Sequence, residues 1–331
     1  MSVIFSSYDE PLGPRATRYF GEGYRKVGPE LAALRLGNSV RPGTRHSAVA
    51  RLEYPAAWST KKHRELVPHV SSVDTVMLAA TLCDAAVTRA RGLTPEQSAR
   101  TWVRHGAVRA GAAPHEDLDH IPVEAQVTAL AEDGDSAETT FKFQVGNLAG
   151  TLTLVHAVGT GSGPELEGVD GFDSLTDIFG PAPHYYLTGV KDHSLSATDL
   201  TVDAEATRVT GRQTVRPGAE GDAGYVGAEA AYWDSVSPID AIVGAAQLSQ
   251  ILLYQMDSLD RTNSDTLWMR KLEFFSEAPP RPSTEEFDGT VEIKRASIID
   301  RGGQRWRSAD LLIKEFQGVT GSCLLAHRLP D

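Results

Sequence analysis

The stretch Val236–Tyr254, VSPIDAIVGAAQLSQILLY, decides the fold. It is apolar on nearly every face, which is typical of a buried helix rather than a surface helix. Ser237 suits an N-cap, and the proline after it suits the first helical turn. The stretch VSSVDTVMLAATL, starting at Val70, matches VSPIDAIVGAAQL at six of thirteen positions when Val70 is aligned with Val236. We therefore expect two equivalent buried helices, over roughly 71–91 and 237–259.

The difference in numbering between Val70 and Val236, which we call the repeat offset, recurs in other blocks of the chain. TWVRH from Thr101 matches LWMRK from Leu267 at the same offset. AGTLTLVHAV from Ala149 matches TGSCLLAHRL from Thr320. Small insertions have made the repeat offset slightly larger there. The openings of the two copies also share a Gly-Pro followed by an aromatic pair. One register through several blocks predicts an internal duplication.

A glycine- and acid-rich stretch, GTGSGPELEGVDG at 159–171, lies between the two copies. No lysine or helix start follows it at the spacing of a phosphate-binding glycine loop, so we interpret it as a flexible connector. The predicted division is an N-terminal half at 1–158, a linker at 159–172 and a C-terminal half at 173–331.

Within each half, the pattern runs strand, strand, long helix and then several strands. Segments such as VEAQVTAL (123–130) and TTFKFQV (139–145) alternate in the way that half-buried strands do. A long helix with an antiparallel sheet around it is an α+β unit. This pattern resembles the hotdog fold, in which a curved antiparallel sheet wraps a central helix. Two copies in one chain look like a tandem double hotdog, whose halves pair as a pseudo-dimer.

Composition narrows the function. The chain has 331 residues, with 44 acidic against 32 basic ones, so a nucleic-acid backbone or an anionic membrane is not expected as its main partner. That balance leaves room for a local basic pocket that binds a phosphate or a carrier arm. Cys83 and Cys323 have no CxxC pairing and are interpreted as buried thiols. With neither a secretory signal nor a long uncharged apolar run, we expect a cytoplasmic protein.

Both helices carry polar residues on one face, since residues four and seven apart share a face. Asp240 and Gln247 share such a stripe in the second copy, and Asp74 and Thr81 share it in the first. A buried carboxylate is costly unless it is hydrogen-bonded or faces a wet cavity. Each aspartate has two open interpretations. It is either a residue of the helix N-terminal turn, or a residue that binds substrate or assists catalysis.

SPIDAIVGAAQ, which includes Gln247, resembles the helix start of hotdog dehydratases that act on acyl thioesters. In those enzymes the catalytic histidine lies about nine residues before the proline of the helix start, which corresponds to His63 in the first copy and Glu229 in the second. The resemblance implies a histidine from one half and an acid from the other. His63 lacks the family's glycine four residues later, and Asp240 precedes the usual acid position by about a turn, so dehydration itself is doubtful.

Other candidates lie near the start of each copy. His184 and His193 flank an expected strand of the second copy, and a histidine there suits a general base at neutral pH. Arg18 takes the place of His184 in the first copy, so the two sites have diverged and one working site is expected. Tyr186 and Arg270 are further candidates for binding substrate. His156 and His327 match across the copies, which favours a structural role. No HxxxH, HxH or Cys/His cluster occurs, so neither a metal nor another cofactor is expected.

The opening SSYDEPLGPRATRYFGEGYRKV, from Ser6, together with the length and layout, resembles the AvrD family. That resemblance implies a role in the synthesis of syringolides, which are acyl-sugar lactones. The implied reaction transfers a β-ketoacyl chain from a carrier thioester, on acyl carrier protein or CoA, to the hydroxyl of a sugar or polyol such as xylulose. AfsA-like butyrolactone synthases, also with two hotdog-like halves, carry out a related transfer.

In this hypothesis a tunnel between the helices holds the acyl chain, and helix N-terminal amides stabilise the oxyanion. His63 or His184 deprotonates the acceptor, and Asp240 orients the acceptor or the base. Three matters stay open: a dehydratase or thioesterase on the same scaffold, a non-catalytic ligand-binding protein, and assembly as a homodimer.

Overall fold

Two long helices, α2 (Ser72–Arg91) and α5 (Pro238–Met256), contain the repeated stretches. In this computed structural model the chain is described over residues 2–56, 58–61, 64–161, 168–203, 205–218, 224–261, 264, 266–283 and 285–330. Each helix begins after a serine N-cap, Ser71 or Ser237, within one residue of the predicted start. The second helix ends at Met256, earlier than the predicted residue 259, and Asp257 is its C-cap.

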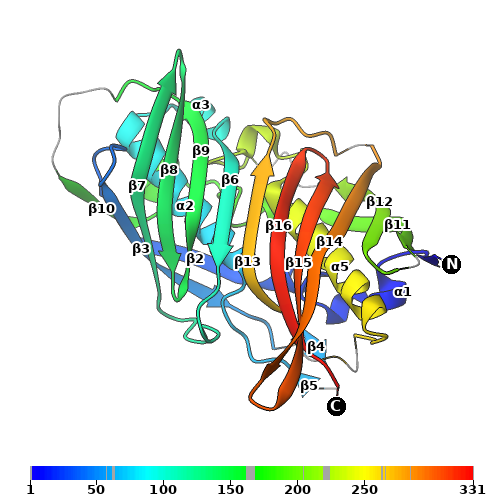
Figure 1. Cartoon of the computed structure of the whole chain (residues 1–331). Helices are drawn as coiled ribbons and strands as arrows, with labels where there is room; N and C mark the ends of the chain where they lie inside the picture. Colours follow the sequence, from blue (N-terminus) through cyan, green and yellow to red (C-terminus); the bar gives the residue numbers. More distant parts are fainter. Residues whose placement is uncertain are drawn as a thin grey trace.

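Among the described residues, fourteen strands form one antiparallel sheet, in the order β1-β11-β12-β14-β15-β16-β13-β6-β9-β8-β7-β3-β2-β10 (Figure 1). Those of the N-terminal half are β2 (Gly28–Gly37), β3 (Arg45–Glu53), β6 (Trp102–Arg109), β7 (Ile121–Asp133), β8 (Ser136–Val145) and β9 (Leu148–Ala157). Those of the C-terminal half are β11 (Ser194–Val202), β12 (Arg208–Arg216), β13 (Trp268–Ser276), β14 (Phe287–Arg301), β15 (Gln304–Phe316) and β16 (Val319–Arg328). The edges are β1 (Val3–Phe5) and β10 (Val169–Ser174).

Short elements, besides a few 3₁₀ turns, lie between these strands and helices. They are helices α1 (Asp9–Leu12), α3 (Pro95–Ala99) and α4 (Thr176–Phe179), and a hairpin of β4 (Thr60–Lys61) and β5 (Arg64–Glu65). In the part of the chain that is described, no helix combines the length and apolar character needed to cross a bilayer.

The two halves have the same strand order and share several irregularities. β6 pairs with β9 with a shift in register between Val103 and His105, and β13 pairs with β16 with the same shift between Met269 and Lys271. The β2–β3 and β11–β12 pairs also shift at positions related by the repeat offset, as do the β7–β8 and β14–β15 pairs. A bulge is a specific local feature of a strand pair, so its recurrence supports the duplication predicted from the sequence.

The halves are joined in two ways. β6 pairs with β13 in the middle of the sheet, so the sheet runs through both halves. At the ends, each half gives its first strand to the other: β1 pairs with β11, and β10 pairs with β2. The last residues of the expected connector, from Val169, therefore belong to a strand. The exact division into halves stays a prediction.

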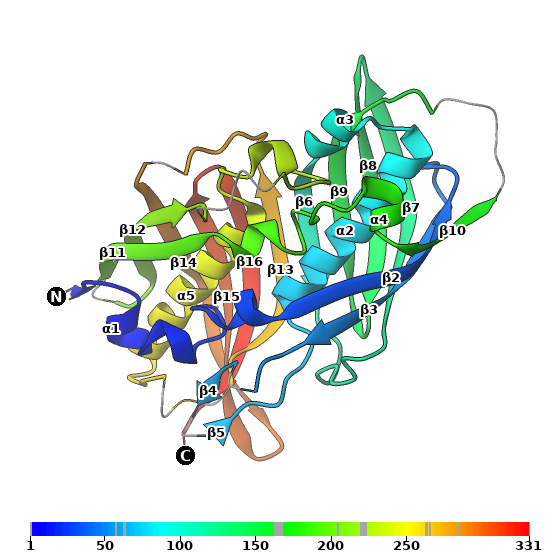
Figure 2. The ribbon, with the colours of Figure 1, turned by 180° about the vertical axis from the view of Figure 1, so that it is seen from behind.

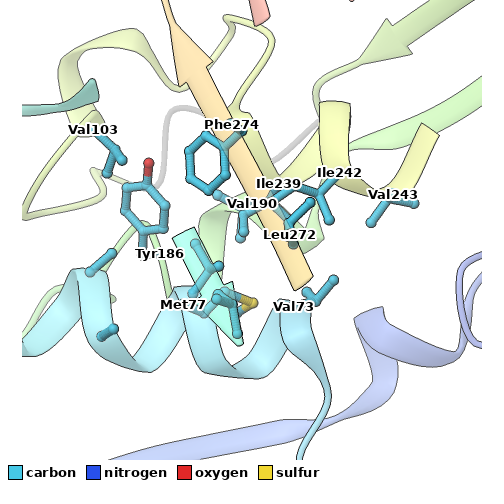
Figure 3. Packing of buried hydrophobic residues seen from close by; sticks show 14 of the residues in the cluster. Val73, Met77, Val103, Tyr186, Val190, Ile239, Ile242, Val243, Leu272 and Phe274 are labelled. Atoms are coloured by element: carbon cyan, nitrogen blue, oxygen red, sulfur yellow. The ribbon is translucent and has the colours of Figure 1, made fainter. Parts of the chain in front are cut away.

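Both long helices lie on the same face of the sheet and contact one another (Figure 2). Val73 and Met77 of α2 and Ile239 of α5 lie in one cluster with Leu272 of β13 (Figure 3). These side chains are buried. Burying one such apolar side chain contributes about 1.5–3 kcal/mol, so the start of both helices is held firmly against the central strands.

Candidate functional site

Asp74 and Asp240 lie at the same place in their helices. Each is the third helical residue and forms a capping box with the serine N-cap before it. Asp240 Oδ2 accepts the backbone N–H of Ser237 at 2.8 Å, and Asp74 Oδ2 accepts that of Ser71 at 3.0 Å. Such boxes satisfy N–H groups that a helix start otherwise leaves unpaired. This geometry favours the structural interpretation of both aspartates, whereas their roles with substrate stay predictions.

Each aspartate has further partners, and these differ between the copies. Tyr19 donates its hydroxyl to Asp74 Oδ2 at 3.2 Å. Tyr54 donates its hydroxyl to Asp74 Oδ2 at 2.6 Å. His193 Nδ1 donates to Asp240 Oδ2 at 2.8 Å, and its Nε2 donates to the carbonyl of Trp233 at 2.7 Å. Burial lowers the pKa of His193, but the charge of Asp240 and the hydrogen bonds to Asp240 and the Trp233 carbonyl together outweigh burial and hold this pKa above its ordinary value. Both ring nitrogens donate, so the imidazole is a cation paired with the cap.

His184 is packed between the halves. Its Nε2 donates to Asp84 Oδ2 at 2.9 Å, and the same oxygen accepts the backbone N–H of Ala228 at 2.7 Å. Both side chains of this pair are buried. A Cβ at Gly227 would overlap His184 Nε2, so the chain passes directly over the ring. His184 therefore occupies a filled interior position, and its role as a base stays a prediction.

Glu229, the counterpart of His63, is held in a buried polar cluster. Its Oε2 accepts Arg281 Nη2 at 2.6 Å, while its Oε1 accepts the Tyr186 hydroxyl at 2.9 Å and the backbone N–H of Val103 at 3.1 Å. Arg281 also donates to the carbonyl of Val236, just before α5. The start of α5 is thus covered by paired groups. His63 itself lies outside the described residues.

At the start of α2, by contrast, the structure has a cavity of about 470 Å³. Both halves line it. The N-terminal half contributes His69, Val70, Ser71, Ser72, residues 110–115 and the pair Asn147 and Leu148; the C-terminal half contributes residues 266–270, Ile299, Arg301 and Trp306. The cavity therefore lies where the two halves meet, beside the N-terminus of one helix.

The cavity occupies the place that corresponds to the Glu229 cluster. At the repeat offset, Tyr186 corresponds to Phe20, Arg281 to His115 and Val103 to Met269. All three counterparts line the cavity. The two side-chain donors to Glu229, the Tyr186 hydroxyl and the Arg281 guanidinium, are thus replaced in the first copy by a phenyl ring and an imidazole, whereas the Val103 donor is a backbone N–H that Met269 also has. Of the two equivalent places, paired groups fill one, and the described residues around the other line a cavity.

Two histidines stand in this cavity. His69 Nδ1 donates to the carbonyl of Val67 at 3.0 Å. Because a carbonyl only accepts, Nε2 of His69 keeps its lone pair and can take a proton. The ring is near Trp58 and Trp268, with centroid separations of 6.1 and 5.9 Å. His115 Nε2 is buried and has no hydrogen-bond partner among the described residues.

The structure distributes the other expected site residues as follows. Arg270 lines the cavity and donates Nη1 to the carbonyl of Gly111 at 3.1 Å. Gln247 accepts from Arg18 Nη1 at 2.6 Å, and Arg18 lines the cavity. Thr81 donates to the Met77 carbonyl within α2, at 2.9 Å. Their proposed contacts with substrate stay predictions.

Sequence reasoning missed His69 and His115. His69 lies two positions before the N-cap Ser71, and this spacing is a local signal that places it at the helix start. His115 gives no local signal, because it lies in an irregular segment between β6 and β7. Its place is set by a backbone contact, in which its carbonyl accepts the N–H of Val70 at 2.9 Å.

Comparison with known proteins gives one family match. A family model described as Pseudomonas avirulence D protein (AvrD) matches residues 3–330. No curated protein matches the chain.

Among solved structures, a dehydratase domain of a trans-AT polyketide synthase from Brevibacillus brevis is 14% identical with a TM-score of 0.37, and the match covers 89% of this chain and 97% of that one. A hotdog-fold protein of unknown function from Alicyclobacillus acidocaldarius is 12% identical with a TM-score of 0.35, covering 89% and 97%. The acyl-CoA thioesterase II TesB2 from Mycobacterium marinum is 10% identical with a TM-score of 0.32, covering 78% and 99%.

Proposed function

Because the chain belongs to the AvrD family, as its opening segment predicted, we propose that it is an acyl-thioester enzyme built as a tandem double hotdog. The repeated strand order and repeated bulges support two hotdog halves. The observation that carries the function is the open cavity at the start of α2, where the counterparts of the Glu229 cluster have been replaced. A pseudo-dimer with one filled and one open site has one working site.

The proposed reaction transfers a β-ketoacyl chain from an acyl carrier protein or CoA thioester to a hydroxyl of a sugar or polyol. The capping box uses the N–H of Asp74, which leaves the N–H of Ser72, a residue that lines the cavity, to stabilise an oxyanion. His69 Nε2 takes the proton of the acceptor hydroxyl as its oxygen attacks the thioester carbonyl. The tetrahedral intermediate then expels the thiolate, which receives the proton from His69. The products are an ester and a free thiol, and cyclisation of the ester gives a lactone.

Dehydration on the same scaffold is less well supported. It would pair a histidine of one half with an acid of the other. Glu229, the acid at the equivalent position, is buried and bound by Arg281 and Tyr186, so it cannot serve the cavity at α2. A thioesterase differs from the proposed enzyme only in using water as the acceptor.

The test is to incubate the protein with a β-ketoacyl thioester, with and without xylulose, and to follow free thiol and ester. Transfer predicts thiol release that depends on the sugar and an ester in equal amount. Release without sugar would identify a thioesterase instead. Binding of the thioester without release of thiol, over a range of chain lengths and polyol acceptors, would identify a non-catalytic ligand-binding protein.

A further inference from the structure

Positive charge gathers in the cavity, although the chain as a whole has a formal net charge of −12. Four arginines line it, and no aspartate or glutamate is among the described residues that do. The arginines are Arg18, Arg261, Arg270 and Arg301. A cavity lined by charges of one sign attracts a ligand of the opposite sign.

Two of these arginines are buried, and the charge of one acts on the other. Arg18 is 3% exposed and Arg261 is 8% exposed. Burial lowers the pKa of both guanidinium groups, and the positive charge of Arg18 lowers the pKa of Arg261 further. The carboxylate of Asp9 raises the pKa of Arg18 and so partly offsets the effect of burial. No carboxylate is among the described groups that act on the pKa of Arg261. A buried guanidinium without a counter-ion is unfavourable, and a bound anion would remove that cost.

The guanidinium groups are also held in fixed orientations. Arg18 Nη1 donates to Gln247 Oε1 at 2.6 Å, and Arg261 Nη2 donates to the carbonyl of Thr17 at 3.1 Å. Two buried N–H donors of the cavity lining, Arg18 Nε and Trp306 Nε1, have no partner within the described part of the chain. Neither group can accept a hydrogen bond, so both need an acceptor from a ligand or from water.

We propose that Arg18 and Arg261 form a subsite for a phosphate group of a substrate. A guanidinium matches phosphate because its planar fork donates two parallel hydrogen bonds to the phosphate oxygens. The proposal rests on the proposed function, because the phosphate group belongs to one of the two substrates of the transfer. It is carried either by a phosphorylated sugar acceptor or by the carrier arm of the acyl donor.

The first experiment measures binding without turnover. Calorimetric titration of the full chain with inorganic phosphate should give one site per chain, and added salt should weaken it. Arg261→Gln should weaken binding at least about tenfold, since it removes one of the two buried charges. Arg51→Gln is the matched control, because Arg51 is exposed on β3 and pairs with Asp119. Equal phosphate affinity in both variants, or no binding by the wild type, would overturn the subsite.

The free protein provides a second readout. Arg261→Gln removes a buried charge that Arg18 repels, but also the hydrogen bond to the Thr17 carbonyl, so the melting temperature without ligand should change little. The variant should nevertheless lose the rise in melting temperature that phosphate produces. A variant that melts far below the wild type in both conditions would mean that Arg261 has a structural role, which contradicts the proposal.

Kinetics distinguish the two sources of phosphate. If the acceptor carries it, Arg261→Gln raises the KM for xylulose 5-phosphate and leaves that for xylulose unchanged. If the carrier arm does, the variant raises the KM for a CoA thioester but not for an N-acetylcysteamine thioester. Phosphate binding without any thiol release would sink the proposed function and leave the subsite standing. If Arg261→Gln leaves thiol release unchanged with every substrate, the subsite is contradicted and the proposed function stands.

Discussion

At the scale of single residues, the hydrogen-bond partners of each histidine decide whether it can exchange a proton with a ligand in the cavity. His69 donates Nδ1 to the Val67 carbonyl, which fixes its tautomer and leaves Nε2 as an acceptor. His184 and His193 instead have buried carboxylate partners, Asp84 and Asp240. The hydrogen-bond partners thus separate a histidine that can exchange a proton with a ligand from two that hold the interior together.

His69→Gln should reduce sugar-dependent thiol release by about 10²–10⁴-fold, the range usual for loss of a general base. The glutamine keeps a donor for the Val67 carbonyl, so the melting temperature should change little. His120→Gln, at an exposed position before β7, is the control and should retain full activity. A His69→Gln variant with the wild-type rate would show that another group takes the proton.

His46 should make the fold sensitive to acid. Both of its ring nitrogens are buried without partners among the described residues, and burial lowers its pKa from 6.5 to about 4. Between these values the unfolded chain binds a proton that the folded chain does not, so stability is full above pH 6.5 and falls as the pH drops toward 4. Urea unfolding at pH 7 and pH 5 should show that His46→Phe reduces the loss of stability by about 2 kcal/mol. His120→Gln should keep the wild-type difference, and an unchanged difference in His46→Phe would contradict the assignment.

At the scale of elements, the two helix starts are alike in structure and unlike in surroundings. Ser71 caps α2 beside an open cavity, and Ser237 caps α5 beneath the Glu229–Arg281 pair. The same local sequence signal therefore produces two helices, of which one has a free N-terminus facing a cavity.

Ser71→Ala and Ser237→Ala form a matched pair. Each removes an N-cap and should lower the free energy of unfolding by about 1 kcal/mol. Only Ser71 lines the cavity, so thiol release should fall in Ser71→Ala beyond what its stability loss explains, and stay near the wild-type value in Ser237→Ala. Equal activities of the two variants at a temperature where both are folded would contradict a site at α2.

The helix starts and the repeat could be predicted because their signals are local: an N-cap serine, an apolar run and a constant offset. The open cavity could not be predicted, because it is recognised only by comparison with the filled place around Glu229. The three groups that bind Glu229, at Val103, Tyr186 and Arg281, are distant from Glu229 along the chain. The exchange of β1 and β10 was equally out of reach, since alternation along a strand says nothing of which edge it joins. The sequence did predict that the copies had diverged, from Arg18 and His184.

At the scale of the whole molecule, the halves hold one another through the sheet. The central β6–β13 pair and the exchanged edges β1 and β10 give three strand contacts between them (Figures 1 and 2). The cavity is lined from both sides, so neither half contains it alone.

A chain cut between residues 161 and 168 should therefore remain one particle. When the two pieces are produced together, size-exclusion chromatography should give the mass of the intact chain, and thiol release should persist. Produced separately, each piece would expose half of the β6–β13 pairing and is expected to aggregate or stay unfolded. Two stable, monomeric pieces would contradict the interdependence of the halves.

The Glu229–Arg281 pair has a consequence for how such a protein can change over generations. In a homodimer one gene encodes both subunits, so every substitution is made twice, and a mutation that fills one site fills both. Joining the copies in one reading frame ends that constraint. A residue such as Arg281 can then be acquired in one copy while its counterpart, His115, is inherited unaltered. Fusion thus lets one half specialise in holding the fold and the other in chemistry.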